Sequence, residues 1–473
     1  MALIPHKTKI VATIGPASES VAKLEEMIRA GMDVARLNFS HGEFDAHKRV
    51  IHNIRAAEKT AGSPVTIMAD LSGPKIRVGR FGAERIELKA GDRFTLTADD
   101  IVGDERRVSV GFARLPAVVK KGDLLSLNDG IIQLEVAEVR GAEVICSVKV
   151  GGELRSRKGL NLPGIDLGIG AFTERDRECL AFALDNGVDA VSQSFVESAA
   201  DVGAVRRAAR ERGQEPFLIA KIERSRALDR LDEIVDAADG IMIARGDLGV
   251  EVPIERIAVI QKDIIRRANR RAKPVITATQ MLESMTTYRL PTRAEATDVS
   301  NAILDGTDCV MLSGESATGA FPVESVAMLA RIAATVEPVR RPVPVREMYE
   351  GLDLSRHVRP EHLLAVSVES SLEFLKPAAV FVHSVTGGTA RRLAALHLPV
   401  PVVAVTSSQA VFQGLRFSYG VIPVREPAAP ASWTDYVKAW LRGRGLAGPF
   451  AIMIQRVPGD DPAGDQRMDI INL

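Results

Sequence analysis

FLIAKIERSRALDRLDEIVDAADGIMIARGDLGVEVP, residues 217–253, is the stretch of sequence that decides the fold class. It begins with an apolar run of strand character at 217–223, and a second such run follows at 240–245. Between them, 225–238 carries apolar residues at helical spacing and stops before a glycine, which predicts an amphipathic helix. A strand, a helix and a strand with short connections predict a right-handed parallel unit, so both strands end at the same rim.

Charged residues lie at both of these predicted strand ends. Lys221 and Glu223 are two residues apart, so they project from the same face of the pleat. Asp247 follows the second strand, directly after Gly246. Two carboxylates that meet beside an ammonium group suit a hard divalent cation such as Mg²⁺ together with a phosphorylated ligand. Judged from this stretch alone, a solvated charge pair at a strand end is the more common arrangement.

The composition is that of an ordinary globular protein with several domains. The chain has 473 residues with 46% hydrophobic content, which is ample for buried cores. Lysine plus arginine equals aspartate plus glutamate, 61 each, so no global field recruits nucleic acid or an acidic membrane. The three cysteines, Cys146, Cys179 and Cys309, are widely spaced, which argues against a disulfide framework or a metal cluster.

The same features predict where the protein works. The N-terminus lacks the apolar core of a signal peptide, and no apolar run reaches the roughly 18 residues that a membrane helix needs. Because the cysteines also favour a reducing compartment, we expect a soluble, cytoplasmic protein.

A strand–helix rhythm runs along much of the chain. In the strand predicted at 33–39, Arg36, Asn38 and Ser40 alternate with apolar residues, so their side chains share one side near the strand end. Helices are predicted at 20–30, 46–60 and 174–186. The predicted strands are 9–14, 33–39, 65–70, 188–195, 217–223, 240–245, 274–279 and 308–313. Eight parallel strands close a TIM (β/α)8 barrel, in which the chemistry takes place at the carboxyl ends of the strands.

Two regions break this rhythm. Residues 72–166 show no strong helix signal but many short Val, Ile and Leu runs cut by glycine, which predicts an all-β insert, a small barrel. The proline-rich, charged segment at 340–347 predicts a linker to a separate α/β unit. The predicted domains are a barrel domain at 1–71 and 167–340, an inserted domain at 72–166 and a C-terminal domain at 341–473.

The C-terminal unit contains one loop of interest. Strands are predicted at 379–383, 402–406 and 450–455, and helices at 361–375 and 389–396. The loop between the first strand and the second helix contains Thr386, Gly387, Gly388 and Thr389. A loop that leaves a strand and opens a helix can bind phosphate through backbone N–H groups, and it can equally be a plain tight turn.

Several long motifs occur in order at the predicted strand ends. They are TKIVATIGPAS at 8–18, RLNFSHG at 36–42, GPKIR at 73–77, KGLNLPG at 158–164, IAKIE at 219–223, IARGDLGVE at 243–251, TATQMLESM at 277–285, PTRAEATDVSNAILDGTD at 291–308 and MLSGESATG at 311–319. Together they closely resemble the pyruvate kinase family over nearly the whole chain. This resemblance favours a functional role for the charged residues at the rim.

The resemblance implies transfer of a phosphoryl group from phosphoenolpyruvate to ADP, which yields pyruvate and ATP. Glu223 and Asp247 would hold Mg²⁺, or Mn²⁺ in its place. Lys221 would neutralise charge on the phosphoryl group and on the enolate, and Arg36 would bind the phosphate. Thr279 would lie beside the substrate carboxylate and near the face where the enolate takes up its proton. The Gly246 N–H and Asp247 would contact the substrate as well.

The resemblance also implies a nucleotide site under a mobile lid. Asn38, His41, Arg77 and Lys158 would bind the nucleotide while the insert closes over the cleft to exclude water. Arg77 and Lys158 lie near the ends of the insert, where solvated basic residues are also common. Ser313 and Glu315 match a family motif and are expected to support the site rather than to take part in the chemistry.

Lys75 departs from the pattern of many family members, which carry glutamate there and require K⁺. The K⁺ of those enzymes lies among residues that match Asn38, Ser40, Asp70 and the backbone of Leu71. A lysine ammonium is a tethered monovalent cation that can replace this charge, and members with lysine at this position are typically independent of K⁺. We therefore expect activity without K⁺. A solvated lysine beside the insert is the alternative.

Two other functions are compatible with a barrel that carries paired carboxylates. One is a lyase or aldolase acting on phosphoenolpyruvate or pyruvate, which would not need the insert. The other is a regulatory paralogue that binds phosphoenolpyruvate without turnover; it would be expected to have lost Arg36, Lys221, Glu223 or Asp247, and all four are present. Family members are typically homotetramers with a C-terminal effector site, so we also expect a homotetramer and a phosphorylated effector.

Overall fold

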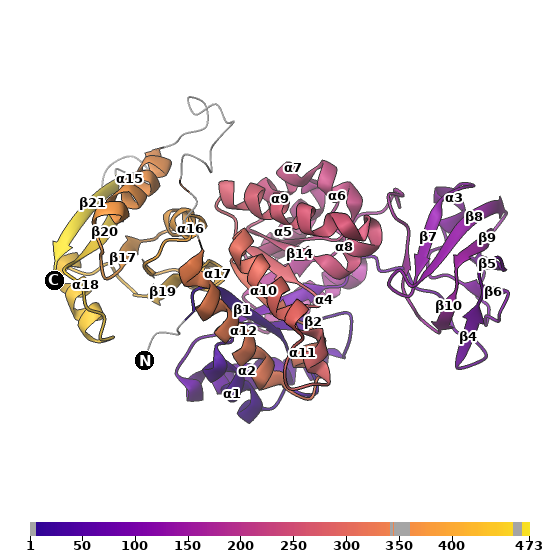
Figure 1. Ribbon diagram of the computed structural model, residues 1–473, viewed down its shortest axis with the longest axis horizontal. Coiled ribbons are helices and arrows are strands. Elements are labelled where there is room, and N and C mark those ends of the chain that lie inside the picture. The colour runs from indigo at the N-terminus through magenta and orange to yellow at the C-terminus, as the bar shows by residue number, and fades with distance from the viewer. Residues whose placement is uncertain (1–5, 341–343, 345–359, 457–465) are drawn as a thin grey trace.

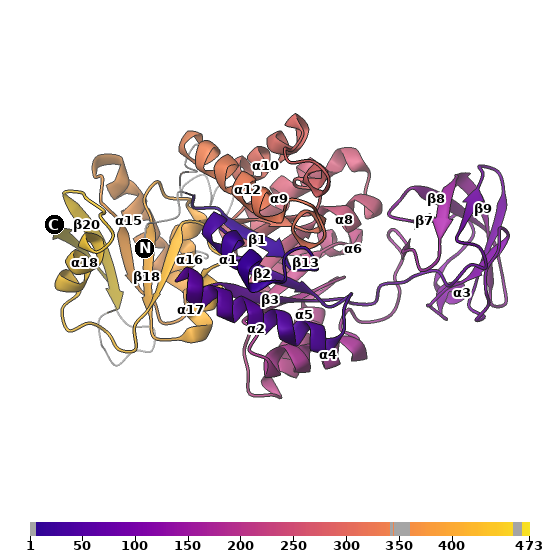
Figure 2. The same ribbon diagram turned by 90° about the horizontal axis from the view of Figure 1, so that it is seen from below.

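The computed structural model describes residues 6–340, 344, 360–456 and 466–473. The described chain forms three bodies along its long axis: a barrel in the middle, the β-rich insert at one end and the C-terminal α/β domain at the other (Figures 1 and 2). Apart from residues 340 and 344, the predicted linker at 340–347 lies outside the described residues.

The central body is a closed barrel of eight parallel strands, which confirms the predicted TIM barrel. Around the barrel the strand order is β1-β16-β15-β14-β13-β12-β3-β2. The strands are β1 (Lys9–Thr13), β2 (Val34–Asn38), β3 (Thr66–Leu71), β12 (Ala190–Gln193), β13 (Phe217–Ile222), β14 (Gly240–Ala244), β15 (Val275–Ala278) and β16 (Cys309–Leu312). All eight pairings are parallel, so the carboxyl ends of the strands lie on one rim.

Amphipathic helices cover the outside of the barrel (Figure 2). They are α1 (Val21–Ala30), α2 (Phe44–Ala61), α4 (Glu174–Asp185), α5 (Ala199–Arg210), α9 (Ile257–Arg270), α10 (Arg293–Asp305) and α12 (Pro322–Val336), with the short helices α8 (Arg245–Glu251) and α11 (Gly314–Ala317) at the rim. Local sequence sets their ends: Ser20 caps α1 by accepting from the Lys23 N–H, and Gly31 ends it in a left-handed conformation. None of the described helices is long and apolar enough to cross a membrane.

The prediction of one helix at 225–238 was wrong. The segment forms two helices, α6 (Ser225–Asp229) and α7 (Leu231–Ala237), separated by Arg230, whose backbone is not helical. The apolar side chains of both helices are buried against the barrel, and their spacing is compatible with one helix or with two, so periodicity could not reveal the break.

The insert is built from β-strands, as predicted, with one short helix, α3 (Leu115–Val118). Its strands are β4 (Arg85–Leu88), β5 (Arg93–Thr97), β6 (Arg107–Ser109), β7 (Leu124–Leu127), β8 (Ile132–Arg140), β9 (Glu143–Val150), β10 (Gly152–Arg155) and β11 (Leu160–Asn161). They form a six-stranded and a two-stranded sheet around one apolar core. The hydrogen bonds of these sheets do not close into a ring, so the insert is barrel-like rather than a closed barrel.

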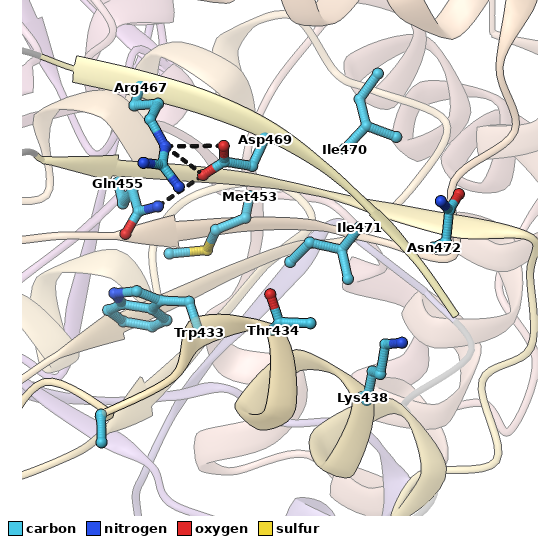
Figure 3. Close-up of a pocket in the computed structure, with 11 residues that line it drawn as sticks. Trp433, Thr434, Lys438, Met453, Gln455, Arg467, Asp469, Ile470, Ile471 and Asn472 are labelled. Atoms are coloured by element: carbon cyan, nitrogen blue, oxygen red, sulfur yellow. Dashed lines mark hydrogen bonds and ion pairs between the residues drawn. The ribbon is translucent and has the colours of Figure 1, made fainter.

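The C-terminal domain has a five-stranded sheet in the order β19-β18-β17-β20-β21. The predicted strands correspond to β17 (Val380–His383), β18 (Val402–Thr406) and β20 (Phe450–Arg456), whereas β19 (Val421–Arg425) and the antiparallel β21 (Gln466–Asn472) were not predicted. The helices are α15 (Pro360–Phe374), α16 (Gly388–Ala395), α17 (Gln409–Leu415) and α18 (Trp433–Arg442). A cavity of about 550 Å³ lies between α18 and the strands β20 and β21 (Figure 3).

The C-terminal domain closes the end of the barrel opposite the rim. Phe417, which follows α17, is 1% exposed and belongs to the apolar cluster inside the lower barrel, where its ring stacks on Phe217 at 5.2 Å. Arg416 beside it lies 3.7 Å from the buried Asp33 carboxylate. The lower end of the barrel, opposite the carboxyl rim, is therefore a packed core. Only the carboxyl rim is available for binding and catalysis.

We expect Phe417→Ala to lower the free energy of unfolding by about 3–5 kcal/mol, because the change leaves a cavity in the barrel interior. Urea unfolding followed by fluorescence measures this difference. Phe374→Ala is the matched control, because Phe374 is 84% exposed. The Phe374→Ala protein should unfold at the same urea midpoint as wild type. An equal effect of the two substitutions would show that Phe417 does not stabilise the barrel.

Candidate active site

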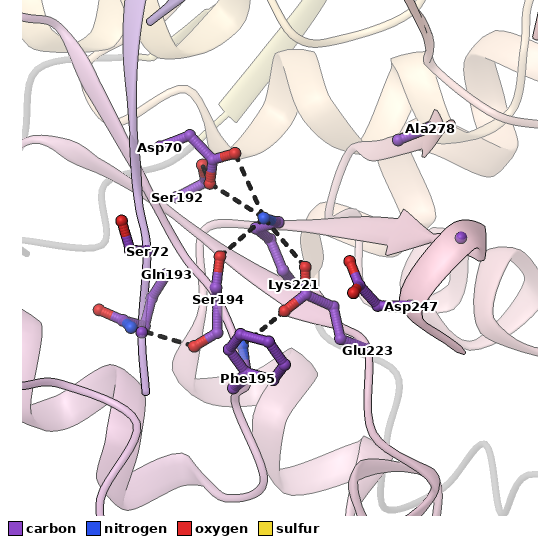
Figure 4. Close-up of polar contacts among 12 residues, drawn as sticks. Asp70, Ser72, Ser192, Gln193, Ser194, Phe195, Lys221, Glu223, Asp247 and Ala278 are labelled. Carbon is purple, nitrogen blue, oxygen red and sulfur yellow. Dashed lines mark hydrogen bonds and ion pairs between the residues drawn. The ribbon is translucent and has the colours of Figure 1, made fainter. Parts of the chain in front are cut away.

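A buried carboxylate, that of Asp70 at the end of β3, organises the rim (Figure 4). Its Oδ2 accepts from Nε of Arg36 at 2.8 Å, and its Oδ1 accepts from Oγ of Ser192 at 2.7 Å. Nζ of Lys221 lies 3.2 Å from it. Burial by itself would raise the pKa of Asp70, but the charges of Lys221 and Arg36 lower it below the ordinary value.

Lys221 projects from β13 into this cluster. Its Nζ donates to Oγ of Ser194 at 2.7 Å and lies 2.9 Å from Oε1 of Glu223. Burial would lower the pKa of Lys221, but the carboxylates of Asp70 and Glu223 raise it above the ordinary value. Lys221 is therefore a buried ammonium group with a fixed position at the rim.

Glu223 and Asp247 form the second half of the site. Oε2 of Glu223 accepts from the Phe195 N–H at 2.8 Å. Asp247, in the first turn of α8, lies beside it (Figure 4). Burial raises the pKa of Glu223, Lys221 opposes that rise, and the Asp247 carboxylate adds to it. Two carboxylates of like charge are thus held together at the rim, where a cation would relieve their repulsion.

Glu223 and Asp247 fit a Mg²⁺ site in which the protein supplies only some of the ligands. Among the described residues, no group of three or more His, Cys, Asp or Glu could hold a metal ion. Mg²⁺ is commonly bound by one or two carboxylates, with water and substrate oxygens completing its coordination. Glu223 and Asp247 are therefore a suitable donor pair for a metal that shares its ligands with an anionic substrate.

Thr279 follows β15 in a left-handed conformation, with φ +71°. Its Oγ1 accepts from the Gly246 N–H at 2.7 Å and lies 2.6 Å from the Ala278 carbonyl. Arg245 donates to the Thr279 carbonyl at 2.8 Å and pairs with Asp298 at 2.7 Å, so it braces this turn. Strained backbone of this kind occurs where the surrounding structure over-determines it, and it clusters at functional sites.

The residues expected at the nucleotide site lie on one side of the rim. The Asn38 amide oxygen accepts from the Ser40 N–H at 3.1 Å, so it caps its own turn. His41 is largely exposed; the burial of part of its side chain and the charges of Arg77, Lys75 and Arg36 lower its pKa. Arg77 pairs with Gly159 in an isolated bridge, which brings Arg77 and Lys158 together at the root of the insert.

Lys75 is the residue that we expect to replace the charge of K⁺. Its ion pair is with Asp247, at 3.7 Å between Nζ and Oδ1, and its side chain is 34% exposed. Asp70 is instead engaged by Arg36 and Lys221. Ser40 donates to Ser72, and the Leu71 side chain is buried. Lys75 thus brings its charge to the carboxylate pair rather than to Asp70.

Sequence analysis missed several residues that hold the site together. Ser192 and Ser194 bind Asp70 and Lys221, and Thr13 accepts from Arg36 at 2.7 Å. The signal was present, because Ser192 and Ser194 stand two residues apart at a strand end, like Lys221 and Glu223.

Glu315 is fully buried and accepts from the N–H groups of Leu282 and Ser313, so it joins the loops after β15 and β16.

The C-terminal loop at 386–389 is a compact turn. The Gly387 N–H is bonded to Ser384 at 3.1 Å, and Arg391 donates to the Thr386 carbonyl at 2.9 Å. None of these loop residues lines the 550 Å³ cavity, although one of its lining residues, Trp433, has its ring 5.1 Å from that of His383. The charged groups converge at the barrel rim and not at this cavity, so the rim is the better candidate for catalysis.

An eight-stranded parallel barrel with a charged cluster at its carboxyl rim, a β-rich insert and an α/β domain defines a TIM-barrel enzyme. Residues 5–326 match the family model described as pyruvate kinase, barrel domain, and residues 362–459 match that described as pyruvate kinase, alpha/beta domain. The chain belongs to the pyruvate kinase family and is a phosphotransferase.

Individual relatives agree with this assignment. A pyruvate kinase of Thermococcus litoralis is 47% identical over 89% of each chain, and one of Thermotoga maritima is 41% identical over 96% of this chain and 97% of its own. A crystal structure of a pyruvate kinase from Cryptosporidium parvum is similar with a TM-score of 0.90 and 36% identity, covering 99% of this chain and 96% of that one.

We expect Asp70→Asn to lower the free energy of unfolding at neutral pH by about 3–5 kcal/mol, because Arg36 and Lys221 would lose a buried partner. The pKa of Asp70 is lowered in the folded state. Its stabilisation is therefore present above the unfolded pKa of about 4 and is lost as the pH falls through the folded pKa, so the two proteins should converge in acid.

Urea unfolding at several pH values measures this difference. Glu153→Gln is the control, because Glu153 pairs with Arg85 and Arg155 on the exposed surface and should show neither effect. A difference between wild type and Asp70→Asn that stays constant down to the lowest pH would contradict the role assigned to the Asp70 charge.

Proposed function

We propose that the protein catalyses Mg²⁺-dependent phosphoryl transfer from phosphoenolpyruvate to ADP, which yields pyruvate and ATP. The observation that carries the proposal is the pairing of two cations, Arg36 and Lys221, on Asp70 directly beside the carboxylates of Glu223 and Asp247. A cationic grip for a phosphate next to a divalent-cation site is the arrangement that phosphoryl transfer requires.

Each group has a role that follows from its position. Arg36 binds the phosphate of the substrate, and the Lys221 ammonium neutralises charge on the transferring phosphoryl group and on the enolate left behind. Glu223 and Asp247 hold the metal, which when bound polarises phosphoryl oxygens as a Lewis acid. Gly246 and Thr279 contact the substrate carboxylate from the turn where they bond to each other.

The nucleotide is proposed to bind between the barrel rim and the insert. Asn38 and His41 lie on the barrel side, and Arg77 and Lys158 lie at the root of the insert. Closure of the insert would exclude water from the phosphoryl group and so favour transfer to ADP over hydrolysis. This proposal assigns residues 1–71 and 167–340 to catalysis and 72–166 to the lid.

The wider setting is proposed from the family. We infer a cytoplasmic homotetramer, and a regulatory C-terminal domain at 341–473 that binds a phosphorylated effector at Thr386, Gly387, Gly388 and Thr389. The support within the chain is the position of this loop at the start of α16, with Arg391 on that helix. Because the loop's own side chains bond its N–H groups, an effector would have to replace those bonds.

The proposed function is tested by Lys221→Met, which removes the ammonium group and keeps an apolar stem. Pyruvate formation from phosphoenolpyruvate and ADP with Mg²⁺ should fall on the order of a thousandfold or more. Lys48→Met, at an exposed helix position, should match wild type. Turnover of Lys221→Met within tenfold of wild type would exclude the role of Lys221. Pyruvate and inorganic phosphate released by wild type without ADP would indicate hydrolysis of phosphoenolpyruvate, with water as the phosphoryl acceptor, rather than transfer to ADP.

The ammonium group of Lys75 is proposed to make K⁺ unnecessary by bringing a fixed cation to the carboxylate pair. We expect full activity in tetramethylammonium buffer and expect Lys75→Glu to acquire a K⁺ requirement. Rates measured with KCl and with tetramethylammonium chloride at equal ionic strength test this. Wild-type enzyme that is inactive until KCl is added would overturn it.

A further inference from the structure

The chain passes between the barrel and the insert twice, at residues 73–76 (the first crossing) and at residues 160–167 (the second crossing). The two crossings meet at a small cavity beside the carboxylate site. The first crossing lines the cavity with residues 74–76, and the second lines it with Leu160, Asn161 and Leu167. The barrel contributes Phe195 and Arg224. Both barrel residues adjoin Glu223: Phe195 donates its N–H to it, and Arg224 follows it in the sequence.

Arg224 holds the second crossing. Its guanidinium donates to the Ile165 carbonyl at 2.7 Å and reaches the Leu162 carbonyl at 3.5 Å. The Leu162 side chain is fully buried in the apolar core of the insert, so this crossing moves with the insert. On the barrel side, Nε of Arg224 lies 3.2 Å from a carboxylate oxygen of Glu197. With 5% of its side chain exposed, Arg224 is a buried cation between insert and barrel.

Glu251, the last residue of α8, also contacts Arg224. The same helix carries Asp247. Oε2 of Glu251 lies 3.6 Å from Nε of Arg224, 3.3 Å from the Ser225 N–H nitrogen and 3.5 Å from that of Gly164. Nε of Arg224 and Oε1 of Glu251 are both buried and lack a hydrogen-bond partner. Buried charged groups normally pair closely. The Arg224–Glu251 contact, at 3.6 Å, is however longer than a hydrogen bond.

The first crossing is in contact with the same site through Phe195. A Cβ on Gly73 would lie 2.9 Å from the Phe195 ring, so the crossing packs directly on it. Phe195 has a left-handed backbone, with φ +58°. Because the N–H of this strained residue is bonded to Glu223, a shift of either crossing reaches the carboxylate site through one residue.

We propose that Arg224 is a positioning residue that couples the position of the insert to the geometry of the carboxylate site. When the insert moves, the planar guanidinium follows the carbonyls of the second crossing and shifts Glu251 at one end of α8 and the backbone next to Glu223. The expected effect on kcat rests on the proposed function. The mechanical coupling itself is a property of the fold and can be measured without catalysis.

The test follows the distance between insert and barrel in the full chain. Lys121→Cys in the insert and Lys48→Cys on α2 place exposed thiols, whereas all three native cysteines are buried, so dyes attach selectively. Single-molecule energy transfer then gives the distribution of insert positions. Arg224→Gln should broaden that distribution and lower kcat about tenfold or more. Glu251→Gln, which keeps the shape of the partner, should broaden it as well.

Arg55→Gln is the matched control. Arg55 also donates to two carbonyls, of Val65 and Gly187, and pairs with two carboxylates, of Glu58 and Asp189, but it lies at the opposite end of the barrel strands. It should leave the distance distribution unchanged, whatever its effect on the melting temperature.

An unchanged distribution in both Arg224→Gln and Glu251→Gln overturns the proposal, and so does equal broadening in Arg55→Gln. If wild type shows no phosphoryl transfer while Arg224→Gln still broadens the distribution, the coupling stands and the proposed function fails.

Discussion

The carboxylate of Asp70 is the constraint on which the rest of the rim depends. It receives Arg36 from β2, Ser192 from β12 and Lys221 from β13, and these strands together with β3 are successive neighbours in the barrel wall. In a low-dielectric interior, two buried cations without this carboxylate would repel each other and would favour a different arrangement of their side chains. One anion therefore connects side chains of four neighbouring strands and holds two cations together at the rim.

From Asp70 the charges alternate across the rim until they reach the carboxylate pair. Lys221 lies between Asp70 and Glu223, and Lys75 lies beside Asp247. The exception to this alternation is the approach of Asp247 to Glu223: burial raises the pKa of Glu223, Lys221 opposes that rise, and the Asp247 charge adds to it. Each of the two carboxylates has one lysine beside it, and their mutual repulsion remains. This like-charge pair is the basis for the proposed divalent-cation site.

The two ends of the barrel differ, and each contacts another part of the chain. The lower end is filled by Phe417 from the C-terminal domain, which makes it a rigid apolar core. The rim is left open, and the insert approaches it through two crossings that pack on Phe195 and Arg224. The C-terminal domain thus packs into one end of the barrel, and the insert contacts the other end through few residues.

By itself the sequence determined the barrel and the convergence of its key charges. The pleat places Lys221 and Glu223 on one face, and the parallel connection brings Asp247 to the same rim; both are local rules. The break at Arg230, the contact of Lys75 with Asp247, the bonding of Asp70 and the insertion of Phe417 were decided by the tertiary structure. Each of these depends on side-chain packing or on partners far apart in the sequence, and strand and helix periodicity contains no information about which distant side chains meet.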